Sequence, residues 1–156
     1  MEQQQKRVIG VDLGGTNMRA GRIYGQTLEA EASFPTPAHA QTQEETIEAL
    51  IRMIEAVWSA EVQAIGIGVP SVVDRAKGIV YNVANIPHWE EVPLKAILES
   101  RFGVPVQVDN DANCFALGER IFGVGQNYAN FVGLTIGTGL GGGIIQRGKL
   151  LADANC

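Results

Sequence analysis

The sequence has little of several features that would mark a specialised class of protein. Aromatic residues make up only 6% of its 156 residues, and 12 Lys and Arg stand against 17 Asp and Glu. The net charge of −5 supplies no electrostatic footprint for a nucleic-acid backbone. No run of about 18 apolar residues occurs, so the sequence offers no membrane-spanning helix. We therefore expect neither nucleic acid nor a membrane as a partner.

The N-terminus and the cysteines favour a cytoplasmic protein. The first twelve residues, MEQQQKRVIGVD, form a polar lead into a strand and lack the apolar stretch of a signal peptide. Cys114 and Cys156 have no metal-ligand spacing and fit reduced thiols. The length suits about one domain of roughly 100–200 residues.

Glycine is the residue type in excess, with 19 in the chain and a concentration between Gly133 and Gly143. Such a concentration indicates backbone that a ligand approaches closely, or unusual turns.

The order of elements predicts an α/β protein. The first 34 residues predict an antiparallel meander of three strands, whose first hairpin loop is Gly14-Gly15-Thr16-Asn17. A capping box at Thr42 and Glu45 then opens a helix. The remaining predicted elements are a strand at 64–69, a loop or hairpin at 70–85 with its turn at 74–78, a helix from Pro93 to Gly103, a strand at 104–108, a helix at 112–122, and strands at 130–136 and 143–151. We expect residues 1–122 to form one domain and residues 123–156 to begin a second, truncated one.

The first glycine loop follows an acidic strand end. Phosphate oxygens would accept from its amides and from the Thr16 hydroxyl, while Asp12 would hold a hydrated Mg²⁺. The alternative is a plain β-hairpin with a glycine turn. The candidate cofactor-binding residues here are Gly10, Asp12, Gly14, Gly15, Thr16 and Asn17.

The second glycine run contains a formal GxGxxG pattern. A dinucleotide fingerprint should open a helix and meet an acidic residue about 20 positions later, whereas here strand-like residues flank both sides. No Walker A motif occurs, so a glycine hairpin touching phosphate fits better. The candidate residues are Gly137, Thr138, Gly139, Gly141 and Gly142.

Between the loops, Asp109-Asn110-Asp111 stands where a strand gives way to a helix. Phosphoryl transfer to a hydroxyl needs a carboxylate that accepts the hydroxyl proton and groups that hold the acceptor. The alternative is that these three residues only cap the helix.

The two loops and this centre, in this order, resemble the ROK family of sugar kinases and sugar-responsive repressors, a branch of the actin–hexokinase–Hsp70 superfamily. The resemblance covers essentially the whole chain. It implies a ribonuclease-H-like, actin-like ATPase domain with a mixed sheet and helices on both faces, plus the first hairpin of a second similar domain. It also implies ATP and Mg²⁺ as cofactors, Asp111 as general base, and Asn110 as a sugar ligand.

The resemblance suggests further sugar-binding residues. Gly68 and Pro70 match a strand-to-loop segment in which glycine commonly follows the proline, and Ser71 departs from that pattern. Asn85 matches an Asn-Leu-Pro-Gly-Trp-like segment; its alternative role is that of a turn amide. We expect Trp89 to anchor the core. Arg19 is placed either to orient the phosphate loop or in a surface salt bridge.

The function expected from the resemblance is that of an ATP-dependent sugar kinase acting on a hexose or N-acetylhexosamine hydroxyl. The alternative is a sugar-sensing ROK transcriptional repressor, which usually carries an N-terminal helix-turn-helix domain. ROK kinases continue with a Glu-x-Gly-His segment, and many have a zinc loop; neither occurs here. We therefore expect the 156-residue chain to be inactive alone and the full-length form to be a homo-oligomer.

Overall fold

The computed structural model describes residues 5–83, 85–137 and 139–151. Its main sheet begins with the predicted antiparallel meander of β1 (Arg7–Leu13), β2 (Asn17–Tyr24) and β3 (Thr27–Pro35). Two later strands, β4 (Val62–Val69) and β8 (Val106–Asn110), add in parallel beside β1. The resulting order is β3-β2-β1-β4-β8, a mixed sheet.

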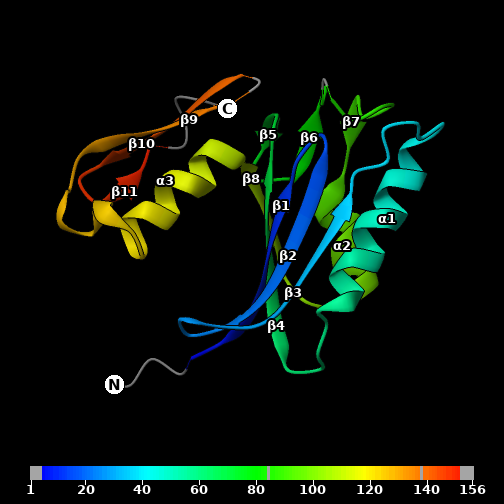
Figure 1. Cartoon of the computed structure of the whole chain (residues 1–156), viewed down its shortest axis with the longest axis horizontal. Helices are drawn as coiled ribbons and strands as arrows, with labels where there is room; N and C mark the ends of the chain where they lie inside the picture. The colour runs from blue at the N-terminus through cyan, green and yellow to red at the C-terminus, as the bar shows by residue number, and fades with distance from the viewer. Residues whose placement is uncertain (1–4, 84, 138, 152–156) are drawn as a thin grey trace.

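Helices cover both faces of this sheet. Figure 1 shows α1 (Gln43–Ala56) and α2 (Leu94–Phe102) on one side and α3 (Asp111–Ile121) on the other. The parallel strands β1, β4 and β8 are joined by segments that contain α1 and α2, as parallel pairing requires a crossover connection. The predicted α/β class with helices on both faces is therefore confirmed.

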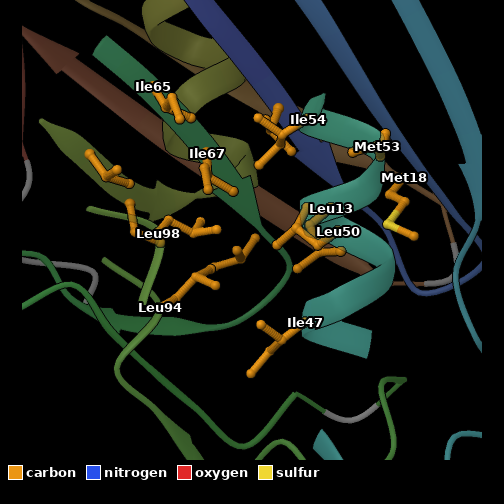
Figure 2. Packing of buried hydrophobic residues seen from close by; sticks show 14 of the residues in the cluster. Leu13, Met18, Ile47, Leu50, Met53, Ile54, Ile65, Ile67, Leu94 and Leu98 are labelled. Carbon is orange, nitrogen blue, oxygen red and sulfur yellow. The ribbon is translucent and has the colours of Figure 1, made fainter. Parts of the chain in front are cut away.

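The core lies between α1, α2 and the sheet. Figure 2 shows Leu50 and Ile54 of α1 gathered with Leu13 of β1 and Ile67 of β4, all of them at most 2% exposed. Burying a side chain of this size contributes about 1.5–3 kcal/mol. The period of the apolar residues in α1 thus fixes which of its faces meets the sheet.

The helix ends differ in how well the sequence predicted them. Pro93 and Gly103 bound α2 as predicted, and Gly103 adopts the left-handed conformation with φ 68°. Thr42 is the N-cap of α1, but its side chain makes no capping hydrogen bond, so the predicted capping box is wrong. The Glu45 carboxylate instead accepts from the Gln41 amide, one residue earlier, at 3.2 Å.

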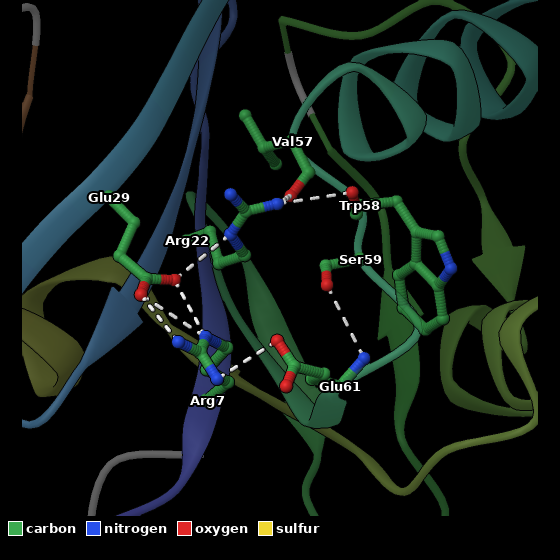
Figure 3. Close-up of polar contacts among 7 residues, drawn as sticks. All are labelled: Arg7, Arg22, Glu29, Val57, Trp58, Ser59 and Glu61. Carbon is green, nitrogen blue, oxygen red and sulfur yellow. Dashed lines mark hydrogen bonds and ion pairs between the residues drawn. The ribbon is translucent and has the colours of Figure 1, made fainter.

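Arg7, Arg22 and Glu29 form a network of hydrogen bonds and ion pairs, here termed the polar brace, that connects the end of α1 to the meander (Figure 3). The guanidinium of Arg22 donates to the carbonyls of Val57 and Trp58, each at 3.1 Å, and so satisfies carbonyls that follow the end of α1. The Glu29 carboxylate accepts from Arg22 and, through three contacts of 2.9–3.1 Å, from Arg7. The hydrogen bonds from Arg7 hold the pKa of Glu29 below its ordinary value, against the opposing effect of burial.

Two small sheets flank the main one. The first contains β5 (Val72–Asp74) and β6 (Ile79–Tyr81), which form the predicted hairpin, and β7 (Glu91–Val92), which sequence reasoning missed. The second contains β9 (Phe131–Ile136), β10 (Leu140–Gln146) and β11 (Lys149–Leu150). A short 3-10 turn at Val124–Asn127 leads into β9.

Two strand predictions need correction. The strand predicted at 143–151 is two strands, because Arg147 and Gly148 adopt φ values of 52° and 76° and form a tight turn. The strand predicted at 104–108 runs instead from Val106 to Asn110, so Asp109 and Asn110 are strand residues and Asp111 opens α3.

Within the described residues, no helix is long and apolar enough to cross a membrane. The expected cytoplasmic location and the domain boundary near residue 122 stay predictions.

Candidate functional site

The first glycine loop is a tight turn between β1 and β2. The Gly14 amide donates to the Asn17 carbonyl at 3.0 Å, and a Cβ at Gly14 would lie 2.6 Å from that oxygen. The turn therefore requires glycine at this position.

Thr36, which sequence reasoning missed, holds this loop from behind. Its hydroxyl donates to the Gly14 carbonyl at 2.7 Å and its amide donates to the Thr16 carbonyl at 2.9 Å, and the residue is 4% exposed. Because C=O and N–H point in opposite directions in a trans peptide, the Gly15 N–H points away from Thr36. The signal in the sequence was a threonine between two prolines just after β3.

Asp12 and Asp111 line one cavity. Asp12 is an exposed residue near the end of β1, and in the sheet it lies beside Gly68 of β4. Asp111 is in the first turn of α3. The cavity of about 390 Å³ is lined by Val11, Asp12, Gly68, Asp111, Cys114, Phe115 and Thr135. Three of the predicted site residues are thus brought together.

Gly68 lies where the start of α3 packs against the end of β4. A Cβ built on it would lie 3.4 Å from both the Cα of Asp111 and the Sγ of Cys114. The start of α3 therefore seats against the end of β4 at a distance that leaves little space for a larger residue.

The electrostatic environment of Asp111 suits a base. Burial raises the pKa of its carboxyl above the ordinary 3.8, the N–H of Ala112 lowers it, and the neighbouring charge of Asp12 raises it again. A carboxylate with a raised pKa accepts a proton more readily than an ordinary aspartate does.

Asn110 is the N-cap of α3. Its Oδ1 accepts from the amides of Ala112 at 2.9 Å and Asn113 at 3.3 Å, and its Nδ2 donates to the Ser71 carbonyl at 3.2 Å. The amide group retains one further N–H that it could donate to a ligand. The capping role that sequence reasoning kept as an alternative is therefore present, and sugar binding by Asn110 stays a prediction.

The second glycine run divides into two kinds of position. Cβ atoms at Gly137 and Gly139 would meet no atom of the described residues within 4 Å, and the Gly137 amide donates to the Gly139 carbonyl at 3.0 Å. Gly141 and Gly142 are residues of β10 and not of the turn, and a Cβ at Gly141 would lie 3.0 Å from the Cβ of Ala112 on α3. Thr138 lies outside the described residues.

The remaining candidates lie around this centre. Asn85 packs against the first loop, because a Cβ at Gly15 would lie 2.5 Å from the Asn85 Cβ. Pro70 directly follows β4, and Trp89 is 2% exposed, as a core anchor should be. Arg19 is in register with Asp12 across β1 and β2, and both residues, together with Gly10, line a larger cavity of about 740 Å³. Asn85, Gly137 and Gly139 do not line the cavity of Asp12 and Asp111.

Sequence reasoning missed four residues that line the cavity, of which Val11 directly precedes the predicted Asp12 in β1. Cys114 and Phe115 lie three and four positions after Asp111, so helical spacing from a catalytic candidate was the available signal. Burial raises the pKa of the Cys114 thiol from 9.0 to about 11, and the nearby charges of Asp109, Asp111 and Asp12 add to this. Thr135 reaches the cavity from β9, and nothing local in the sequence indicated this.

The residues present fit a hydrated magnesium ion better than a protein-enclosed metal. Among the described residues, no group of three or more His, Cys, Asp and Glu could hold a metal. Asp12 is an exposed carboxylate with no ion-pair partner in the described part of the chain. One or two carboxylates are the usual protein contribution to Mg²⁺, which keeps several of its waters.

The fold and the site together define an α/β domain with two glycine turns and an acidic centre. Residues 8–155 match the model of the ROK family, and the chain belongs to that family. Its fold is the actin-like ATPase fold of the ROK sugar kinases.

The relatives include kinases of two sugars. A glucokinase of Streptomyces coelicolor is 43% identical over 145 residues, which cover 91% of this chain and 44% of the relative. An N-acetyl-D-glucosamine kinase of Vibrio cholerae is 37% identical over 150 residues, which cover 94% of this chain and 48% of the relative. The chain thus spans about half the length of these curated relatives.

Solved structures show the same fold. A ROK glucokinase of Streptomyces griseus in complex with glucose and AMPPNP superposes with a TM-score of 0.83 at 39% identity, over 92% of this chain and 46% of that one. A ROK transcriptional regulator, a homologue of the E. coli MLC protein, superposes with a TM-score of 0.84 at 26% identity, over 96% of this chain and 39% of that one.

Proposed function

We propose that the natural protein containing this chain is an ATP-dependent sugar kinase, which transfers the γ-phosphoryl group of ATP to a hydroxyl of a hexose or N-acetylhexosamine. The observation that carries the proposal is the shared cavity of Asp111 and Asp12. The identities of 43% with a glucokinase and 37% with an N-acetyl-D-glucosamine kinase support it.

Asp111 acts as the general base in this proposal. Its Oδ1 accepts from the Ala112 amide at 2.8 Å, and in the described part of the chain Oδ2 has no hydrogen-bond partner. Oδ2 is therefore available to a sugar hydroxyl and accepts its proton as the hydroxyl oxygen attacks the γ-phosphorus. Burial supports this role, because it raises the pKa of the carboxyl.

The two glycine turns hold the phosphates of ATP. At the first loop the Gly15 N–H points away from Thr36, and at the second loop Gly137 and Gly139 leave open space for close approach. The proposed set is completed by Gly10, Gly14, Thr16, Asn17, Thr138, Gly141 and Gly142. Asp12 would hold Mg²⁺ through water, and the ion would supply charge that neutralises the phosphate oxygens.

Asn85, Asn110, Gly68 and Pro70 are proposed to hold the sugar. Asn85 packs on the first loop, and the backbone of Gly68 lies at the Asp111 cavity. An amide can both donate to and accept from sugar hydroxyls, which suits both asparagines. Fixing the sugar hydroxyl near Asp111 is the main contribution of such residues to the rate.

The second candidate function is that of a sugar-sensing repressor. The likeness to a ROK transcriptional regulator, with a TM-score of 0.84 over 39% of its length, favours it. The net charge of −5 and the intact Asp111 favour the kinase. Sugar binding without sugar-stimulated ADP release, in the natural protein, would move the assignment to the sensor.

The kinase proposal is tested by Asp111→Asn in the natural protein. ADP release is measured with ATP, Mg²⁺ and a panel of hexoses and N-acetylhexosamines. We expect kcat to fall by about 10²-fold or more, the effect of losing a general base. Glu48→Gln, an equivalent change at a 70% exposed side chain of α1, should leave kcat unchanged. Near-normal kcat in Asp111→Asn would refute the assignment.

A further inference from the structure

Asp109 is a buried carboxylate that the proposed reaction does not use. The residue is 5% exposed and directly precedes Asn110 and Asp111. Its Oδ1 accepts from the Asn110 amide at 2.8 Å and from the Asn113 side chain at 2.9 Å. These two donors lie on either side of Asp111 in the sequence, so the Asp109 carboxylate restrains the segment of chain that carries Asp111.

The other oxygen of Asp109 faces Arg75. Arg75 is in the turn between β5 and β6, and its Nε lies 2.7 Å from Oδ2. The N–H does not point along this line, so the contact is an ion pair and not a directed hydrogen bond. The same turn is tied to β8 by the Gln107 side chain, which donates to the Arg75 carbonyl at 3.4 Å.

The charge of Arg75 compensates for the burial of the Asp109 carboxylate. Burying a carboxylate is unfavourable unless it is paired and hydrogen-bonded. In the described part of the chain, Arg75 is the only cation in ion-pair contact with Asp109. Without Arg75, the Asp109 carboxylate would lack a partner charge and would turn toward water, which would weaken its hydrogen bonds to Asn110 and Asn113.

We propose that Arg75, acting through Asp109, is a positioning residue that sets the place of Asp111 in the cavity. This inference rests on the proposed kinase function. Arg75 itself does not line the cavity, so it acts only through its partner. A displacement of about 1 Å at a reacting group can cost roughly 10²-fold in rate, so a buried clamp beside the base is expected to affect kcat.

The test compares three variants of the natural protein. Arg75→Met should lower kcat about 10-fold or more while the KM values for ATP and sugar change less than about 3-fold. Lys77→Met removes a cation from the same turn, where the 71% exposed Lys77 pairs with the half-buried Asp74 at 3.6 Å, and should leave kcat within about 2-fold. Arg75→Lys should have a kcat close to that of the unchanged protein, because the contact with Asp109 needs a positive charge and not the paired N–H donors of a guanidinium.

A double-mutant comparison covers the case in which Arg75→Met folds poorly. Asp109→Asn keeps Oδ1 as an acceptor but removes the charge, and should lower kcat by a similar factor. Adding Arg75→Met to it should then change kcat by less than about 2-fold, because the two residues act as one unit. Losses that multiply, or an unchanged kcat in Arg75→Met while Asp111→Asn is inactive, would overturn the inference and leave the kinase proposal intact. Full activity in both Arg75→Met and Asp111→Asn would overturn the kinase proposal itself.

Discussion

Gly143→Ala should separate α3 from β10. A Cβ at Gly143 would lie 2.5 Å from the Ala112 carbonyl oxygen and 2.6 Å from the Ala116 Cβ. Carbon atoms in contact normally stand about 3.5–4.0 Å apart, so the helix would have to move by roughly 1 Å. Both alanines are fully buried, and an alanine has no rotamer through which it could yield. We expect the overpacking to cost about 1–3 kcal/mol.

Gly142→Ala is the matched control. Its Cβ would meet Leu134 Cδ2 at 3.5 Å, which is ordinary contact, and neither Gly142 nor Gly143 has a positive φ. Removing glycine freedom from the unfolded chain there should stabilise by about 0.4–1 kcal/mol. With an m-value of about 2 kcal/mol/M in urea, the two variants should differ by about 0.7–2 M in the midpoint of unfolding.

Urea unfolding of the two variants, followed by circular dichroism, measures this difference, and hydrogen exchange of the β10 amides shows whether the loss is local. Faster exchange in Gly143→Ala alone would place the damage where α3 meets β10. Equal midpoints with equal exchange in the two variants would mean that α3 does not seat on β10 through Gly143, and the packing account of the second glycine run would fail.

Two further predictions concern this chain directly. Arg22→Met removes both hydrogen bonds to the carbonyls that follow α1 and should lower the free energy of unfolding in urea by about 1–3 kcal/mol. The control Arg52→Met changes a 62% exposed side chain and should stay within about 0.5 kcal/mol of the unchanged chain. Equal effects of the two variants would show that the polar brace in Figure 3 does not stabilise the fold. The Cys114 thiol, with a pKa of about 11 instead of 9.0, should react with iodoacetamide about 100-fold more slowly when folded than in urea at pH 8, measured in a Cys156→Ser background. Its rate should keep rising about tenfold per pH unit up to pH 10, and a plateau below pH 9 would contradict the raised pKa.

The local pattern predicted the meander and the helices well. The strands of the meander are bounded by glycine turns, and α2 is bounded by Pro93 and Gly103, so each boundary has a residue with a backbone preference of its own. β7 has only two residues, Glu91 and Val92, and carries no pattern of its own. It forms because Glu91 and Val92 pair with the edge of β6, and the periodicity of the sequence does not predict such a pairing.

The roles of the individual glycines in the second glycine run could not be predicted from the sequence, for a different reason. Gly139 and Gly143 are the same residue in the same run, yet one has open space around it and the other faces the backbone of α3. Sequence reasoning selected Gly141 for phosphate binding and passed over Gly143, although both pack against α3. Only the approach of the helix distinguishes a glycine that admits a ligand from one that admits a neighbouring element.

The three residues Asp109, Asn110 and Asp111 have similar side chains, and their different surroundings in the fold give them different roles. Asp109 ended the predicted strand two residues early because aspartate is rare in strands, and it is tolerated there only through Arg75, which is 34 positions away in the sequence. With both its oxygens engaged and 5% of its surface exposed, Asp109 cannot serve as the base. Asn110 cannot accept a proton, and its Oδ1 is occupied by the cap. Of these three residues only Asp111 lines the cavity, and the hydrogen bonds of Asp109 and Asn110 to residues 110, 112 and 113 hold the chain on both sides of it.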